Sequence, residues 1–180
     1  VAARQQEEEH RLEAERQAAL ATQVQQLEHM QQTVQASRAA AEGADAQVNA
    51  ADDYSRAVAQ QTEADQLFAR QNYPGAHARY EEARAGFAHA REQAQLLTLK
   101  VTVERARADM QVAQKAALLV TADTLAAGLM REAMAAEQQA DTALTNGEFA
   151  SARQSYETAQ QQYARAEAQA RTEQQRQMQR

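Results

Sequence analysis

The side chains best suited to metal chemistry in this sequence are four histidines, His10, His29, His77 and His89. No two of them lie three or four residues apart, so no pair shares one helix face in the way that two metal ligands on a helix must. Glu7 precedes His10 by three residues, but a di-iron helical bundle needs this Glu-x-x-His spacing on two core helices, with two further glutamates. The pattern therefore predicts no metal site, and a metal- or ligand-binding helical bundle is the least favoured of three functional alternatives.

Acid–base and nucleophilic chemistry have equally few candidates. Carboxylates are paired at Asp52-Asp53 and Glu81-Glu82, but adjacent residues of a helix point in different directions and do not share a shaped pocket. The five glycines are isolated, so there is no glycine-rich phosphate loop, and the lack of cysteine excludes a disulfide or a cysteine nucleophile. We predict no catalytic residues, no bound cofactor and no enzymatic activity.

The composition favours long helices with a thin core. The chain has 45 alanines and 29 glutamines, whereas leucine, valine and phenylalanine together number 24. Alanine is the best helix former, but its small side chain buries little apolar surface. The net charge is −6 without the basic stripe typical of nucleic-acid binding. The longest apolar run, residues 116–120, is far too short to span a membrane, so we predict neither nucleic-acid binding nor membrane insertion.

The beginning of the chain has no initiator methionine and no signal-peptide pattern, so we interpret it as a segment of a longer protein. Arginine outnumbers lysine 17 to 2, which together with the alanine content suggests a bacterial source. These features leave the cellular compartment undetermined.

The sequence contains a repeat of 76 residues. Residues 64–90 align with residues 140–166, and the rare aromatic positions coincide. The coinciding pairs are Phe68 with Leu144, Tyr73 with Phe149, Tyr80 with Tyr156, and Phe87 with Tyr163. A match of scarce rings, rather than of abundant alanines, indicates two copies of one structural unit.

Upstream of the rings, each copy carries a heptad seam whose positions alternate by four and three residues. The seam of the second copy is Leu99, Val103, Ala106, Met110, Ala113, Ala117 and Val120. Subtracting 76 gives the seam of the first copy: Gln23, Leu27, Met30, Val34, Ser37, Ala41 and Ala44. We expect the first helix of each unit to bury this face.

We predict an all-α, elongated fold of two tandem 76-residue units with three helices each and coiled-coil-like terminal helices. Its parts are a charged extension over 1–19, unit 1 over 20–95, unit 2 over 96–171 and a polar helical tail over 172–180. The helices are expected over 20–42, 46–71 and 74–95, and again over 96–119, 122–145 and 149–171. Because no glycine or proline lies between residues 88 and 127, one long helix from about 74 to 119 should be shared by both units, and a continuation to 145 stays open.

Two kinds of corner separate the predicted helices. The first lies at Gly43, with Asp45 as a candidate N-cap, and its equivalent in unit 2 has Thr121 or Asp123 in that role.

The second corner, residues 72–75, holds the only proline of the chain. Pro74 suits the first turn of a helix, and Asn72 suits the left-handed conformation that ends the helix before it. Residues 145–149 make the same corner with different residues, so we interpret both as geometry rather than chemistry, with Tyr73 as part of the core.

The second corner and the helix after it resemble the second half of a tetratricopeptide repeat. That family has a turn followed by small residues and an aromatic at helical spacing. The matching positions are Gly147-Glu148-Phe149 with Ala152, Tyr156 and Ala159, and, less closely, Gln71-Asn72-Tyr73 with Ala76, Tyr80 and Ala83. The period differs, at 76 rather than 34 residues. The tandem three-helix plan is also similar to spectrin-like arrays, although the tryptophan of that family is missing. These resemblances imply protein binding or spacing rather than catalysis.

We therefore expect a non-catalytic scaffold or protein–protein interaction segment, which binds a protein partner or holds flanking domains apart. The alternative is a coiled-coil oligomeriser or spacer in which residues 1–42 and 96–119 pair with other copies. Most rings are expected to fill the cores of the units, and Tyr54 and Tyr163 are the candidates to line a partner-binding groove.

The seams give a first test. Leu27→Asp or Val103→Asp should unfold the unit that contains it, because an unpaired carboxylate in a core is strongly unfavourable. Thermal unfolding followed by circular dichroism measures the effect, and a melting curve unchanged by either substitution would show that the seam faces solvent.

Overall fold

The computed structural model describes residues 2–179, and over these residues the chain is all α-helix and turns, with no strand. Its helices are α1 (Ala2–Glu42), α2 (Ala46–Asn49), α3 (Ala51–Ala69), α4 (Tyr73–Leu119), α5 (Ala122–Leu125), α6 (Ala127–Thr145) and α7 (Phe149–Met178). The all-α prediction is confirmed. Val1 and Arg180, the outermost residues of the two predicted extensions, lie outside the described residues.

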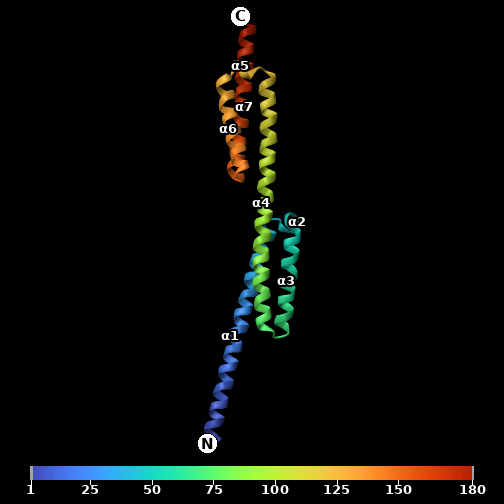
Figure 1. The fold of residues 1–180 in the computed structure, drawn as a ribbon, viewed down its shortest axis with the longest axis vertical. Coiled ribbons are helices and arrows are strands. Elements are labelled where there is room, and N and C mark those ends of the chain that lie inside the picture. The colour runs from blue at the N-terminus through green and yellow to red at the C-terminus, as the bar shows by residue number, and fades with distance from the viewer. Residues whose placement is uncertain (1, 180) are drawn as a thin grey trace. The chain divides into compact units, whose positions relative to one another are not determined.

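The chain divides into two compact units, Val1–Leu96 and Leu97–Arg180, each with its own core. In the first unit, α3 lies beside the C-terminal part of α1 and residues 73–96 of α4, as Figure 1 shows in blue, teal and green. The largest fully buried side chains of this unit are Tyr80, Phe87 and Val34. Side chains of residues 4–23 are all exposed, and this part of α1 continues away from α3 without a neighbouring helix in its own unit (Figure 1).

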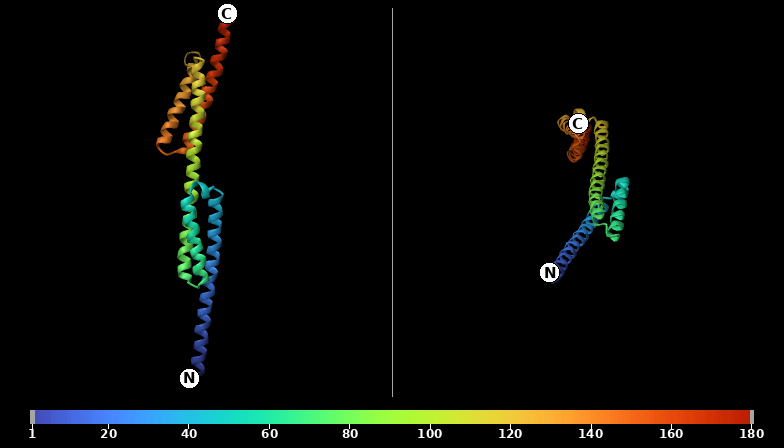
Figure 2. Two further views of the ribbon diagram at one scale, coloured as in Figure 1. Left: turned by 90° about the vertical axis from the view of Figure 1, so that its right-hand side faces the viewer. Right: turned by 60° about the horizontal axis from the view of Figure 1, so that its bottom comes forward.

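The second unit is built in the same way from residues 97–119 of α4 and from α6 and α7, as the left view of Figure 2 shows. Its largest fully buried side chains are Tyr156, Tyr163, Met110 and Val103. In both units most of the other buried residues are alanines. The core of each unit is therefore a few large side chains set among alanines.

The backbone repeats at the 76-residue offset wherever it leaves the helix. Asp45 and Thr121 both have a left-handed conformation, with φ of 57° and 54°. Ala50 and Ala126 share a second unusual conformation, with φ of −142° and −137°. The short helices α2 and α5 lie between these points. The sequence predicts a break near Asp45 and near Thr121 but one unbroken helix after each, so the interruptions at Ala50 and Ala126 were missed.

The corner between the second and third helices is a Schellman motif in both units. In unit 1 the Asn72 N–H donates to the Leu67 carbonyl at 2.9 Å, and the Gln71 N–H donates to that of Phe68 at 2.9 Å. In unit 2 the equivalent bonds join Glu148 to Ala143 at 2.8 Å and Gly147 to Leu144 at 3.0 Å. The residue with positive φ is Gln71 in one unit and Gly147 in the other.

Two local predictions were wrong. Asp45 precedes α2 but makes no capping hydrogen bond with its side chain, because it serves the corner through its left-handed backbone. Asn72 is not the left-handed residue. Its side-chain oxygen Oδ1 accepts a hydrogen bond from the Gly75 N–H at 3.1 Å, so it caps the start of α4. The helix shared by the units ends at Leu119, where the sequence places its end, and the continuation to residue 145 that the sequence left open does not occur.

The seam residues are largely buried. In the first unit Leu27, Val34 and Ala41 are in the core, and in the second Val103, Met110 and Ala117 take the same places. The outermost positions differ from the expectation, since Gln23 and Leu99 are exposed. The seam therefore begins one turn later than its spacing predicts.

The two left-handed corner residues provide a matched test. A non-glycine residue in this conformation carries strain of about 1–2 kcal/mol, which glycine avoids. We expect Gly147→Gln to lower the free energy of unfolding by about 1 kcal/mol, and Gln71→Gly to raise it by a smaller amount, since glycine adds entropy to the unfolded chain. Chemical denaturation measures both, and changes of the same sign would contradict this assignment of strain.

Candidate functional site

The two rings predicted to line a partner groove lie in the cores. Tyr163 is fully buried and Tyr54 is 8% exposed. In both cases the hydroxyl group reaches the edge of the bundle, where it joins a cluster of polar side chains. The two clusters are therefore the places to look for a functional centre, and their hydrogen bonds and pKa values show whether they could transfer protons.

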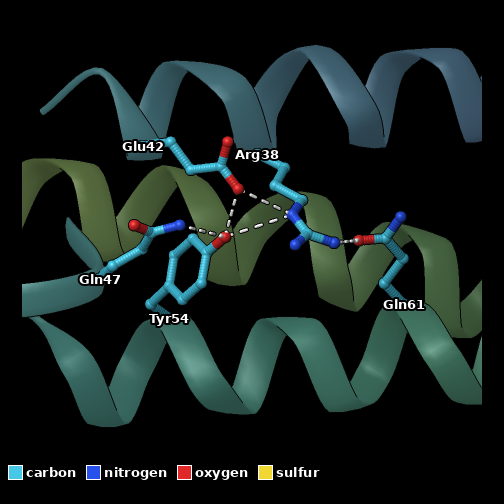
Figure 3. A network of polar contacts seen from close by, with 5 residues as sticks. All are labelled: Arg38, Glu42, Gln47, Tyr54 and Gln61. Carbon is cyan, nitrogen blue, oxygen red and sulfur yellow. Dashed lines mark hydrogen bonds and ion pairs between the residues drawn. The ribbon is translucent and has the colours of Figure 1, made fainter. Parts of the chain in front are cut away.

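The cluster of unit 1 is formed where the first corner brings α1, α2 and α3 together. The Tyr54 hydroxyl donates to Glu42 Oε1 at 2.5 Å, and Arg38 Nε donates to the same carboxylate oxygen at 2.9 Å. Arg38 Nε and Gln47 Nε2 lie 3.2 Å and 3.3 Å from the Tyr54 oxygen, and Arg38 Nη1 reaches Gln61 Oε1 at 3.5 Å. Figure 3 shows these five side chains converging on the tyrosine oxygen and on the guanidinium group.

This arrangement moves the pKa values of both charged groups further from neutral pH. Hydrogen bonds from Tyr54 and then Arg38 lower the pKa of Glu42, and hydrogen bonds to Glu42 and Tyr54 raise the pKa of Arg38. A general acid or base works best when its pKa lies near the working pH. Glu42 therefore stays a carboxylate and Arg38 a cation, and the cluster is suited to holding the corner rather than to proton transfer.

Unit 2 builds the equivalent cluster with different residues. Gln114 replaces Arg38 and Glu137 replaces Gln61, at the offset of 76. The Tyr163 hydroxyl donates to Glu137 Oε2 at 2.6 Å, and Gln114 Nε2 donates to Glu137 Oε2 and to the Tyr163 oxygen, both at 3.0 Å. The hydroxyl thus comes from the third helix of this unit, whereas in unit 1 it comes from the second.

The exchange of rings explains this difference. Tyr163 stands at the place of Phe87, and Met130 stands at the place of Tyr54. In unit 1 the rings of Tyr54 and Phe87 pack edge to face, with centroids 5.5 Å apart. Each unit therefore has one phenol hydroxyl in this cluster. The second helix supplies it in unit 1, and the third helix supplies it in unit 2.

A second tyrosine–carboxylate contact is the same in both units. Tyr80 donates to Asp65 Oδ1 and Tyr156 donates to Asp141 Oδ1, each at 2.5 Å. Burial, with the neighbouring carboxylate second, raises the pKa of Tyr156 to about 12, and burial followed by Glu137 raises that of Tyr163 to about 12. These phenols remain protonated donors at neutral pH, as structural hydrogen bonds require.

The remaining candidates from the sequence are spread over the helices. Over the described residues there is no group of three histidine, aspartate or glutamate side chains that could hold a metal ion. His29 and His77 line one shallow groove of unit 1, and His89 Nε2 lies 3.5 Å from Asp53 Oδ2. None of the helices in the described part of the chain is apolar over a length that would cross a membrane.

The surface feature that the sequence interpretation missed lies on α4. Its residues 97–119 expose a row of apolar side chains, the α4 stripe, consisting of Leu97, Val101, Ala108, Val112 and Leu119. Val101 is 61% exposed, Val112 68% and Leu119 85%. The spacing of four, seven, four and seven residues could have revealed this row. The sequence interpretation used only the seam on the opposite face of the same helix.

Comparison with known proteins adds no family to this description. The chain matches no protein-family model, and the comparisons with curated proteins and with solved structures gave no match.

The hydroxyl of Tyr163 provides a stability test with a defined pH dependence. Tyr163→Phe should lower the free energy of unfolding by about 1 kcal/mol at pH 8, since one hydrogen bond is lost. A phenol whose pKa is raised from 10 to about 12 by folding stabilises the fold fully below pH 10 and loses this contribution as the pH rises toward 12. The variant should therefore lose less stability than the original chain between pH 8 and pH 11.

Denaturant titrations at the two pH values measure this difference. Tyr73→Phe is the control, because the Tyr73 ring is only partly buried, so this change removes a tyrosine hydroxyl outside the Tyr163 cluster. Identical pH dependence in the original chain and Tyr163→Phe would mean that the buried phenol is not linked to folding.

Proposed function

We propose that this chain is a non-catalytic helical-repeat segment that binds protein, acting as a scaffold or spacer within a larger, bacterial protein. The observation that carries the proposal is the contrast between the polar clusters and the α4 stripe. The polar side chains of each cluster hydrogen-bond to one another within their own unit, whereas large apolar side chains stand exposed on α4. The polar groups are thus engaged within the units, and the apolar side chains of the α4 stripe are exposed to a partner.

The repeat supports this reading. Both units keep the same corners at the same spacing, while the exposed residues differ between them. A unit reproduced in this way is suited to presenting a surface at a fixed place along a chain, as in the tetratricopeptide-like and spectrin-like families that the sequence resembles. Tyr54 and Tyr163 then contribute to the shape of the units, and binding falls to the exposed face of α4.

Coiled-coil oligomerisation is the second candidate, and the same stripe favours it. An apolar row repeating at four and seven residues on a long helix is the pattern that pairs helices. In this case the protein partner is another copy of the chain.

The proposal can be tested by photo-crosslinking in bacterial cells that express the chain. A benzophenone amino acid at Val112 should give discrete protein adducts, because the stripe would be in contact with a protein. The same amino acid at Ala36, which is the equivalent exposed position of unit 1, should give few. If position 112 forms no adduct, or no more than position 36, the α4 stripe is not a protein-binding face and the proposal fails.

A further inference from the structure

The α4 stripe is concentrated on one side of its helix. At 3.6 residues per turn its five residues lie within roughly 60° of the helix circumference. The buried residues of the same segment, Val103, Met110 and Ala117, lie on the side roughly opposite. Residues 97–119 thus have two faces rich in apolar residues, although Lys115 also lies within the arc of the stripe. The core of unit 2 uses only one of these faces.

The bundle itself does not require the second face. At the offset of 76, unit 1 has small or polar residues at all five positions. They are Ala21, Gln25, Gln32, Ala36 and Gly43. Since unit 1 builds the same three-helix arrangement with these residues, the large side chains of the stripe serve something other than the fold of unit 2.

The spacing of the stripe is nearly symmetric about its centre. Leu97 and Leu119 lie eleven residues on either side of Ala108, and Val101 and Val112 lie seven and four residues from it. Such a row matches itself when a second helix runs in the opposite direction. Leu97 then lies opposite Leu119 of the other copy. Val101 lies opposite Lys115 and three residues, about 4.5 Å along the axis, from Val112 of the other copy, which side chains can span.

The centre of the row suits a close contact between two helices. Ala108 would face its own equivalent, and a small side chain at a crossing point lets two backbones approach closely, as alanine does within the units. The larger valine and leucine side chains lie above and below it, where helices that cross at an angle leave more room.

Charges beside the stripe agree with an antiparallel pair. Arg105 and Asp109 lie on one flank of the row and are both exposed. Among the described residues, neither is joined to another side chain by an ion pair or hydrogen bond. In an antiparallel pair the same flanks meet, so Arg105 of each copy approaches Asp109 of the other. In a parallel pair these flanks lie on opposite sides of the contact.

We propose that the occupant of the α4 stripe is a second copy of this chain, with its own stripe packed antiparallel about Ala108. The inference rests on the proposed function, because it identifies the protein partner of that face as the chain itself. The contact joins two isologous surfaces, as most homodimers do, and it buries the exposed valines and leucines of both copies together.

The full chain should show a reversible monomer–dimer equilibrium in sedimentation velocity and light scattering, with the mass rising with concentration toward twice 19.9 kDa. Val112→Glu should weaken the dimer at least tenfold, because it places a charge within the apolar contact, one turn from its centre at Ala108. Ala36→Glu, the matched change in unit 1, should leave the equilibrium unchanged. A monomer at every concentration, or a dimer that Val112→Glu does not weaken, would overturn the proposal.

A charge exchange tests the orientation. Arg105→Asp should weaken the dimer by placing two aspartates together, and the double change Arg105→Asp with Asp109→Arg should restore it, since opposite charges again meet across the pair. If the double variant remains as weak as Arg105→Asp, the antiparallel register is wrong. Circular dichroism spectra and melting curves show that each variant is folded, which is expected because all the changed residues are exposed.

The photo-crosslinking at Val112 separates the failure of this inference from that of the proposed function. Adducts at twice the mass of the chain, identified by mass spectrometry as two copies, agree with the antiparallel pair. Adducts only to another protein, together with a monomer in solution, would overturn self-association and leave the proposed protein-binding function standing.

Discussion

The fold depends on how closely alanine lets its helices approach. Buried alanines line the contacts of both units, from Ala57 and Ala83 in the first to Ala133 and Ala159 in the second. Each buries little apolar surface, at about 0.8 kcal/mol for a CH₂ group, so alanine contacts alone give a thin core. The benefit is proximity, because helices packed on small side chains bring their backbones and polar groups within reach of one another.

The polar clusters follow from that proximity. A tyrosine ring that starts between two closely packed helices is long enough to carry its hydroxyl to the edge of the bundle, where a carboxylate of a neighbouring helix accepts it. The contacts of Tyr80 with Asp65 and of Tyr156 with Asp141 are identical in the two units. The clusters around Tyr54 and Tyr163 consist of different residues, and a different helix supplies the hydroxyl in each unit. Each unit nevertheless has such a cluster. The two units therefore share a hydrogen-bonded phenol at this place in the bundle, and not a particular residue.

Much of this fold could be predicted from the sequence, because its signals are local or periodic. The rings Tyr80 and Tyr156, the long helix α4 and the positions of the corners follow from spacing and from the few helix-breaking residues. The left-handed residues did not follow, since Gln71, Asp45 and Thr121 are not glycines. At Gln71 the conformation belongs to a Schellman motif, which its side chain does not announce. The burial of Tyr54 and Tyr163 depends on which helix faces each face of the bundle. The two rings lie on different helices of their units, so the repeat in the sequence does not show that they take equivalent places.

The distribution of large apolar residues in α4 is the strongest reason to consider what lies outside the chain. The core of unit 2 takes Val103 and Met110 from this helix, while the stripe holds two valines and two leucines in solvent. A chain so poor in such residues loses stability by placing them outside its own core, since burial of a leucine or valine is worth about 1.5–3 kcal/mol. Unit 1 avoids this arrangement with alanine, glutamine and glycine at the same positions. The exposed row is thus specific to unit 2, and its near-symmetric spacing is the property that favours a second copy over an unrelated helix as its partner.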